Sequence, residues 1–97
     1  MSTYVILRRN GWRTPEELQE AAVRSLDEAD RMSGDVRWIR SYVLTELSGE
    51  LGTACVYQAA SPEAIRTHAS RALLPVDEIV AVANTMIVRR DSLPVGS

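Results

Sequence analysis

Three segments of the chain have the hydrophobic pattern of β-strands. Residues 4–9 (YVILRR) begin with an apolar run of β-forming side chains, and Asn10-Gly11 breaks this run with turn-forming residues. Residues 36–46 (VRWIRSYVLTE) and 53–59 (TACVYQA) alternate with a period of two, which is typical of strands. The pattern therefore predicts three strands, with a hairpin turn at 47–52 (LSGELG) between the second and third.

Residues 15–32 repeat apolar side chains at helical spacing instead. The apolar positions that share one face are Leu18, Ala21, Ala22, Leu26, Ala29 and Met32. Thr14 can cap the first turn, Pro15 suits the first helical position and Glu17 completes a capping box. A helix is therefore expected from Pro15 until residues 33–35, with Gly34 as its C-terminal cap.

A second helix is expected to begin at Ser61. Ser61 can cap it, Pro62 occupies its first turn, and Glu63 complements the positive end of the helix dipole. The helix should run to about Leu73, because Pro75 cannot continue it. Residues 77–90 (DEIVAVANTMIVRR) then predict a last strand, with 79–82 and 86–88 as its apolar parts.

The resulting element order is β-α-β-β-α-β. The simplest fold with this order is a ferredoxin-like α+β sandwich, in which one antiparallel sheet carries both helices on one face. A chain of 97 residues is long enough for one domain and too short for two. We expect a single ferredoxin-like domain over residues 1–91 and a flexible tail over 92–97.

Two helices would leave the other face of the sheet open. With an even-length turn centred on residues 48–49, the hairpin would place Tyr42 beside Cys55 and Arg40 beside Tyr57. The side chains predicted on the open face are Trp38, Arg40, Tyr42, Leu44, Cys55 and Tyr57. This face is too apolar for water, which favours a homodimer interface or a small-molecule pocket between two sheets. The residues expected to bind that ligand are Trp38, Arg40, Tyr42, Cys55 and Tyr57.

Composition and charge narrow the classes of partner. The chain is 45% hydrophobic and 25% charged, with a net charge of −2 and a pI of about 5.3, so it lacks the basic excess of nucleic-acid-binding proteins. Segment 53–59 also lacks the basic residue and repeated aromatics of RNA-recognition domains with this element order. No apolar run approaches membrane-spanning length, and the N-terminus lacks a signal-peptide pattern. We expect a cytoplasmic protein without nucleic-acid or membrane partners.

His68 and Cys55 are the only histidine and the only cysteine. His68 lies near the edge of the apolar stripe of the second predicted helix. It is either a boundary residue hydrogen-bonded to a backbone or carboxylate oxygen, or a metal ligand or proton carrier. Cys55 is either inert packing or a soft metal ligand when deprotonated. The lone histidine, the missing Gly-x-Ser-x-Gly elbow and the missing phosphate loop argue against hydrolase and nucleotide-binding chemistry.

The most distinctive string follows the third predicted strand. It reads Cys55-x-Tyr57-x-Ala59-x-Ser61-x-Glu63-Ala64-Ile65-Arg66-x-His68-Ala69, followed by Leu74-Pro75. From Val36 to Val82 the chain resembles a family of small bacterial ferredoxin-like proteins that are nickel-binding or nickel-responsive, otherwise described as a domain of unknown function. The resemblance implies a homodimer with a nickel site in at least one member. His68 matches a family histidine, so it is the metal ligand that the resemblance implies.

Three functions follow as hypotheses. The favoured one is a small homodimer that binds a small ligand or divalent metal at the open sheet face, without established catalysis. The second is an enzyme of the dimeric α+β barrel type, an isomerase or oxygenase, in which His68, Tyr42 and Arg40 supply acid–base and orienting groups. The third is a carrier of nickel or another divalent metal that uses His68.

Overall fold

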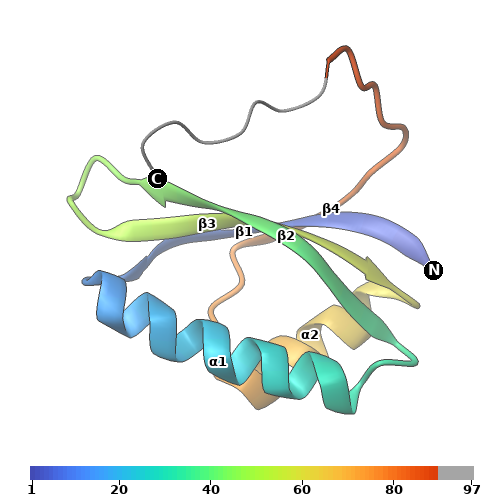
Figure 1. Cartoon of the computed structure of the whole chain (residues 1–97), viewed down its shortest axis with the longest axis horizontal. Helices are drawn as coiled ribbons and strands as arrows, with labels where there is room; N and C mark the ends of the chain where they lie inside the picture. The colour runs from blue at the N-terminus through green and yellow to red at the C-terminus, as the bar shows by residue number, and fades with distance from the viewer. Residues whose placement is uncertain (90–97) are drawn as a thin grey trace.

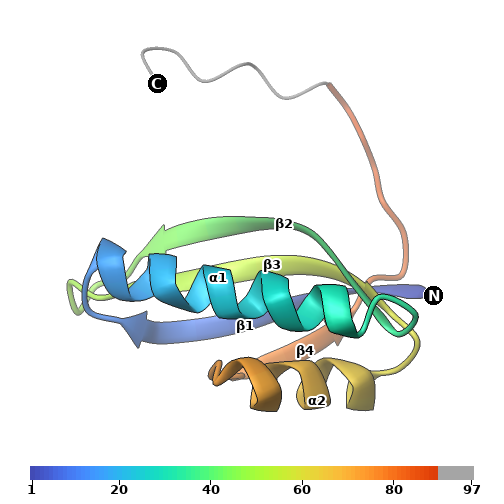
Figure 2. The same ribbon diagram turned by 60° about the horizontal axis from the view of Figure 1, so that its bottom comes forward.

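The computed structural model describes residues 1–89 and consists of a four-stranded sheet and two helices. In chain order the elements are β1 (Ser2–Trp12), α1 (Pro15–Arg31), β2 (Val36–Thr45), β3 (Leu51–Ala59), α2 (Pro62–Ala72) and β4 (Glu78–Ala81). The strand order is β2-β3-β1-β4, and neighbouring strands are antiparallel. Both helices cover the same face of the sheet (Figures 1 and 2). The predicted ferredoxin-like sandwich is confirmed, and the predicted tail at 92–97 lies outside the described residues.

Both helices begin with the predicted caps. Thr14 Oγ1 accepts the backbone N–H of Glu17 at 3.1 Å, and Ser61 Oγ accepts that of Ala64 at 3.2 Å. Each bond satisfies a donor that the first helical turn leaves unpaired. Across residues 1–89, no helix is long and apolar enough to cross a membrane.

α1 differs from the prediction at its C-terminal end and on its buried face. Met32 is the cap residue, and its N–H donates to carbonyls in the last turn of α1, so the assignment of the cap to Gly34 was wrong. Ser25 is buried, whereas Leu26 is 53% exposed. The helix is rotated so that Ala21, Ser25 and Ala29, spaced by four residues, form its buried stripe.

β1 continues through the residues that were predicted to end it. Arg8 pairs with Thr53 and Trp12 pairs with Leu51, so residues 9–11 of β1 stand opposite a single residue of β3. Asn10 takes a positive φ of 51°, which asparagine tolerates better than most residues. The predicted turn is therefore a β-bulge.

β4 is shorter than the last strand that the sequence predicted. It pairs with β1 from Glu78 to Ala81, and the N–H of Val82 donates to Thr3 O at 2.9 Å. Because Thr3 is close to the start of β1, later residues find no strand to pair with. The predicted strand at 86–88 is therefore wrong: these side chains are more than 80% exposed, and the segment projects away from the sheet on the side opposite the helices (Figure 1).

The β2–β3 hairpin has a different register from the predicted one. An odd number of residues, 46–50, connects Thr45 to its partner Leu51. An odd connection shifts every pair of β2 and β3 residues by one position relative to an even turn. Because side chains alternate along a strand, a given β2 side chain then shares its face of the sheet with the other set of β3 side chains. Tyr42 consequently pairs with Ala54 instead of Cys55.

A second irregularity in β2 turns Trp38 toward the helices. Trp38 pairs with Tyr57, but Arg40 pairs with Val56, so Ile39 is an extra residue in the ladder. Without this bulge, Trp38 and Arg40 would share one face. With it, Trp38 lies on the face of Tyr57, and Arg40 lies on the opposite face.

Candidate functional site

The residues predicted to share the open face are divided between the two faces of the sheet. Cys55 and Tyr57 are 4% and 1% exposed and belong to the core beneath the helices, and Trp38 packs against that core. Arg40 and Tyr42 lie on the helix-free outer face. The placement of Trp38, Cys55 and Tyr57 on the open face was therefore wrong, because the odd hairpin connection and the bulge in β2 reverse their sides.

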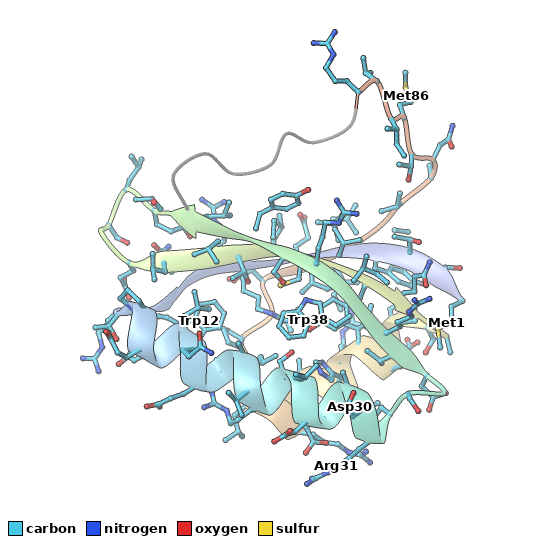
Figure 3. The ribbon with its side chains drawn as sticks, viewed as in Figure 1. Met1, Trp12, Asp30, Arg31, Trp38 and Met86 are labelled. Carbon is cyan, nitrogen blue, oxygen red and sulfur yellow. The ribbon has the colours of Figure 1, made fainter. Side chains whose placement is uncertain are left out.

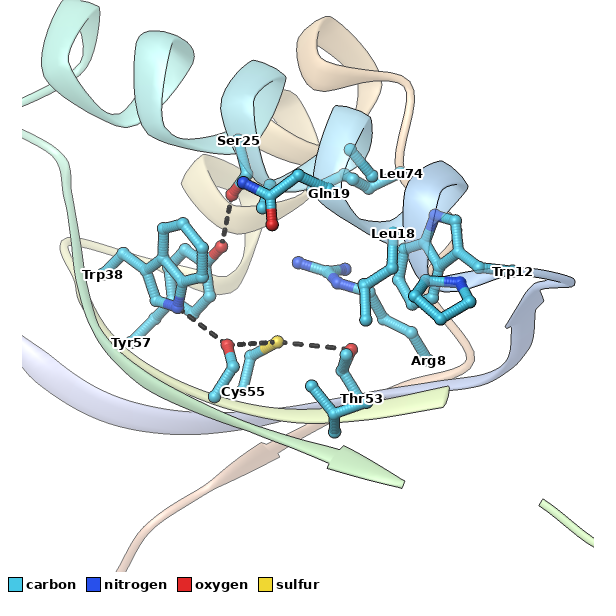
Figure 4. A pocket seen from close by; sticks show the side chains of 15 residues that line it. Arg8, Trp12, Leu18, Gln19, Ser25, Trp38, Thr53, Cys55, Tyr57 and Leu74 are labelled. Atoms are coloured by element: carbon cyan, nitrogen blue, oxygen red, sulfur yellow. Dashed lines mark hydrogen bonds between the residues drawn. The ribbon is translucent and has the colours of Figure 1, made fainter. Parts of the chain in front are cut away.

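A cavity of about 300 Å³ lies between α1 and the inner face of the sheet. Trp38 and Tyr57 stand at one end, Trp12 at the other, and Leu18 of α1 extends over the space between them (Figure 4). Both tryptophans point into the layer between the sheet and α1 (Figure 3). Concave sites of this size with mostly apolar walls are typical of small-molecule ligands.

The floor of the cavity is a chain of hydrogen bonds along β2 and β3. Trp38 Nε1 donates to Ser41 Oγ at 2.8 Å, and Ser41 Oγ donates to Cys55 Sγ at 3.0 Å. Cys55 Sγ then donates to Thr53 Oγ1 at 3.4 Å (Figure 4). These polar groups satisfy one another, and Cys55 is a free, buried cysteine within this chain of hydrogen bonds.

Tyr57 connects the cavity to the core. Its ring stacks on Trp38 with centroids 6.1 Å apart and an interplanar angle of 11°. Its hydroxyl lies 3.0 Å from Ser25 Oγ of α1. Burial raises the pKa of Tyr57, and the hydrogen bond with Ser25 opposes this shift only in part, so the phenol stays protonated and holds α1 against β3.

His68 is fully buried between the helices and the sheet. Its Nε2 lies 2.9 Å from the carbonyl oxygen of Ser25, and its ring lies 5.4 Å from that of Tyr57. Because a carbonyl oxygen can only accept, Nε2 carries the proton and Nδ1 is the bare nitrogen. Burial lowers the pKa of His68, so the ring is neutral at pH 7. The predicted hydrogen bond to a backbone oxygen is present, although the residue is in the core and not at its boundary.

The surroundings of His68 do not fit a nickel site. Divalent nickel needs several nitrogen, oxygen or sulfur ligands, and within residues 1–89 no group of three or more His, Cys, Asp or Glu side chains is placed to hold a metal ion. The Nε2 proton of His68 is donated to Ser25, so only Nδ1 has a free lone pair, and one nitrogen cannot supply the several ligands that nickel needs. The charge of Arg8 also lowers the pKa of His68, and a cation that disfavours an imidazolium disfavours a metal ion at the same place.

The acid–base group suggested for an isomerase or oxygenase is not assembled within the chain. His68 lies in the core on the helix side of the sheet, whereas Tyr42 and Arg40 lie on the outer face. The sheet separates the imidazole from the other two side chains. That hypothesis was therefore wrong about which residues meet.

Arg8 is the cavity residue that the sequence reasoning missed. It lies in β1, is 1% exposed and lines the cavity. Its signal was the strand period itself, because Arg8 follows Tyr4 and Ile6 at intervals of two and so shares their buried face. Arg9, the next residue, points outward and is exposed, so the two adjacent arginines differ in burial although they look alike in the sequence.

Comparisons with known proteins agree with this architecture. Residues 4–82 match the family model described as "Nickel responsive protein SCO4226-like". The crystal structure of SCO4226 from Streptomyces coelicolor A3(2) is similar, with a TM-score of 0.69 at 23% sequence identity, covering 88% of this chain and 100% of that chain. No curated protein matches the chain. The likeness to the solved structure supports the fold.

Proposed function

The chain belongs to the SCO4226-like family of nickel responsive proteins, and within that fold we propose that it binds a small, mostly apolar organic molecule in the cavity between α1 and the sheet. The observation that carries the proposal is the cavity of about 300 Å³ with both tryptophans in its wall. This location replaces the outer sheet face as the ligand site, and it keeps Trp38, Cys55 and Tyr57 as lining residues.

Binding fits these residues better than catalysis does. Ser41, Cys55 and Thr53 bond to one another, and the Tyr57 hydroxyl is paired with Ser25. Among the described residues, no His, Asp or Glu side chain lines the cavity as a base for these groups. His68 is not among the residues that line the cavity.

Intrinsic fluorescence tests the proposal directly, since the only two tryptophans, Trp12 and Trp38, both line the cavity. The chain is titrated with 3-phenylpropanoate and with 3-phenylpropanamide, and a saturable change is expected for at least one of them. Ala22→Phe should abolish it by filling the cavity from α1. Val23→Phe, at a 53% exposed position of the same helix that does not line the cavity, is the matched control and should bind normally.

Two results would contradict the proposal. The first is that neither compound gives a saturable signal with the unaltered chain. The second is that Ala22→Phe binds a compound as tightly as Val23→Phe does. In the second case the compounds bind outside the cavity.

We also propose that the protein is a homodimer formed through the outer face of the sheet. Pairs such as Val5 with Val56 and Leu7 with Ala54 make this face apolar, and Tyr42 adds a 52% exposed ring. Burial of such a face against a second copy is favourable. The sedimentation coefficient tests this: Tyr42→Glu should give a monomer, and Leu26→Glu, at a 53% exposed position on α1, should not. A monomeric unaltered chain would refute the dimer.

Nickel binding by this chain remains a prediction. The family description suggests it, whereas the surroundings of His68 do not favour it. Calorimetry with nickel chloride on the unaltered chain and on His68→Gln decides the matter. We expect identical heats for both, since within residues 1–89 no group of three or more ligand side chains is placed to complete a site around the free Nδ1 of His68. Loss of a binding isotherm in His68→Gln alone would restore His68 as a metal ligand.

A further inference from the structure

Arg8 places a positive charge at the wall of a mostly apolar cavity. Its side chain is 1% exposed, and among the described residues no Asp, Glu, His or second Arg lines the cavity. A buried guanidinium is costly unless an anion and hydrogen-bond acceptors compensate it. The acceptors and anions around Arg8 therefore decide what the cavity can hold.

The described residues provide the Arg8 guanidinium with some hydrogen-bond acceptors but not with a counter-ion. Nη1 donates to the carbonyl oxygen of Pro75 at 2.9 Å, and the guanidinium carbon lies 6.0 Å from the centre of the Tyr57 ring. Nη2 is buried and has no hydrogen-bond partner within residues 1–89. The carbonyl of Pro75, the ring of Tyr57 and the protonated Tyr57 hydroxyl, which also interacts with Arg8, are all neutral, so the charge has no anion.

Two carboxylates that contact β1 are already used by the residues that follow Arg8. Glu46 accepts from Arg9 Nε and Nη2 and from the N–H of Asn10. Asp77 accepts the backbone N–H of Arg9. In the described part of the chain, no salt bridge includes Arg8. The one missing component is an anion on the cavity side.

We propose, on the basis of the cavity function above, that Arg8 is the recognition group of the cavity and that its ligand is a small apolar monocarboxylic acid. One carboxylate oxygen accepts from Arg8 Nη2, and the hydrocarbon part lies between Trp38 and Trp12 (Figure 4). Hydrogen bonds to a charged donor are stronger than neutral ones, so the acid is preferred over its neutral analogues.

Size and charge limit this class further. A dry cavity of about 150 Å³ accommodates benzene, so about 300 Å³ has room for an aromatic ring with a short acidic side chain. A second carboxylate on the ligand would meet the apolar wall without a cation and would be buried unpaired. The cavity is therefore expected to reject dicarboxylates of the same size.

The test compares 3-phenylpropanoate with its isosteric amide by calorimetry and tryptophan fluorescence. We expect the unaltered chain to bind the acid about tenfold or more tightly than the amide, as one charge-assisted hydrogen bond provides. Arg8→Met, which keeps an unbranched apolar stem but removes the charged guanidinium, should remove this preference. Arg24→Met is the matched control, because Arg24 also donates to a carbonyl, that of Ala72, but does not line the cavity.

The outcomes separate this inference from the cavity function. Equal affinity for acid and amide, with both lost in Ala22→Phe, overturns the role of Arg8 and leaves the cavity function standing. No binding of either compound overturns both. If Arg8→Met does not fold, two measurements on the unaltered chain still test the proposal. One is the ratio of the affinities for the acid and the amide. The other is the affinity for phenylsuccinate, a dicarboxylate, and binding as tight as that of 3-phenylpropanoate would overturn the monocarboxylate class.

Discussion

The Nε2 atom of His68 donates to the main-chain carbonyl oxygen of Ser25 across 2.9 Å, and so joins α2 to α1 inside the core. The hydroxyl of the same serine lies 3.0 Å from that of Tyr57 on β3. Ser25 thus connects both helices and the sheet at the inner end of the cavity.

Protonation of His68 should lower stability on the acid side of neutrality. Burial, the first cause, and the charge of Arg8 lower its pKa, while the bond to Ser25 and the charge of Glu28 oppose this in part. The unfolded state, with a pKa near 6.5, therefore binds more protons than the folded state as pH falls below that value. The free energy of unfolding should decrease from about pH 6.5 downward and level off below the folded pKa.

His68→Gln supplies the control for that pH dependence. A glutamine amide can still donate to Ser25 O but does not titrate. Urea unfolding at several pH values should give a flat profile between neutrality and about pH 5 for the variant. An unchanged slope in His68→Gln would mean that another group titrates there.

The hydroxyls of Ser25 and Tyr57 should be energetically coupled. Tyr57→Phe leaves the buried hydroxyl of Ser25 without its partner, which costs about 1–3 kcal/mol. Ser25→Ala in the Tyr57→Phe background should then cost much less than it does alone. Tyr4→Phe, at a 9% exposed tyrosine whose hydroxyl has no hydrogen-bond partner within residues 1–89, should change the free energy of unfolding by less than about 0.5 kcal/mol. Strict additivity in the double-mutant cycle would refute the coupling.

Gly52 should not tolerate a side chain. A Cβ at this position would lie 2.7 Å from the backbone oxygen of Arg8 and 2.7 Å from Glu46 Oε2. Gly52→Ala should therefore destabilise the protein by about 1–3 kcal/mol, because β1 or Glu46 must move. Gly34→Ala, where a Cβ meets nothing within 4 Å, should be close to neutral in the same thermal melt.

Glu46 should make stability fall again in more acidic solution. Hydrogen bonds from Arg9 and from the N–H of Asn10, together with the charge of Arg9, lower the pKa of Glu46 below the unfolded value of 4.5. Its contribution is present above pH 4.5 and is lost as pH falls from there through the folded pKa. Glu46→Gln should lower the melting temperature at pH 7 and reduce the acid slope, whereas Glu20→Gln, at an exposed position of α1, should do neither.

The local parts of the fold could be predicted because they depend on residues close in sequence. Thr14 and Ser61 cap their helices as expected, since a cap needs only the residue and the next turn. The buried face of α1 was misjudged at Leu26 because apolar residues occur on two sides of that helix, and packing on the sheet selects the side of Ser25. The end of β4 depends on where β1 begins, which is not a local property.

The candidate site likewise has one feature that depends on local sequence and one that depends on distant residues. Alternation along β1 by itself put Arg8 on the face of Tyr4 and Ile6. Sequence could not reveal that Glu46 and Asp77 are bound to residues 9 and 10 and so are withheld from Arg8. A charge becomes a recognition group only when its surroundings leave it without a counter-ion.

The sequence by itself determined the order β-α-β-β-α-β, the helix starts and the identity of the aromatic residues on β2 and β3. Only the tertiary structure decided on which face those aromatics lie. The period of a strand is two, so the odd connection at 46–50 and the bulge at Ile39 were enough to reverse the result. As a result, Trp38 and Tyr57, which were predicted on the outer face of the sheet, line a cavity beneath α1.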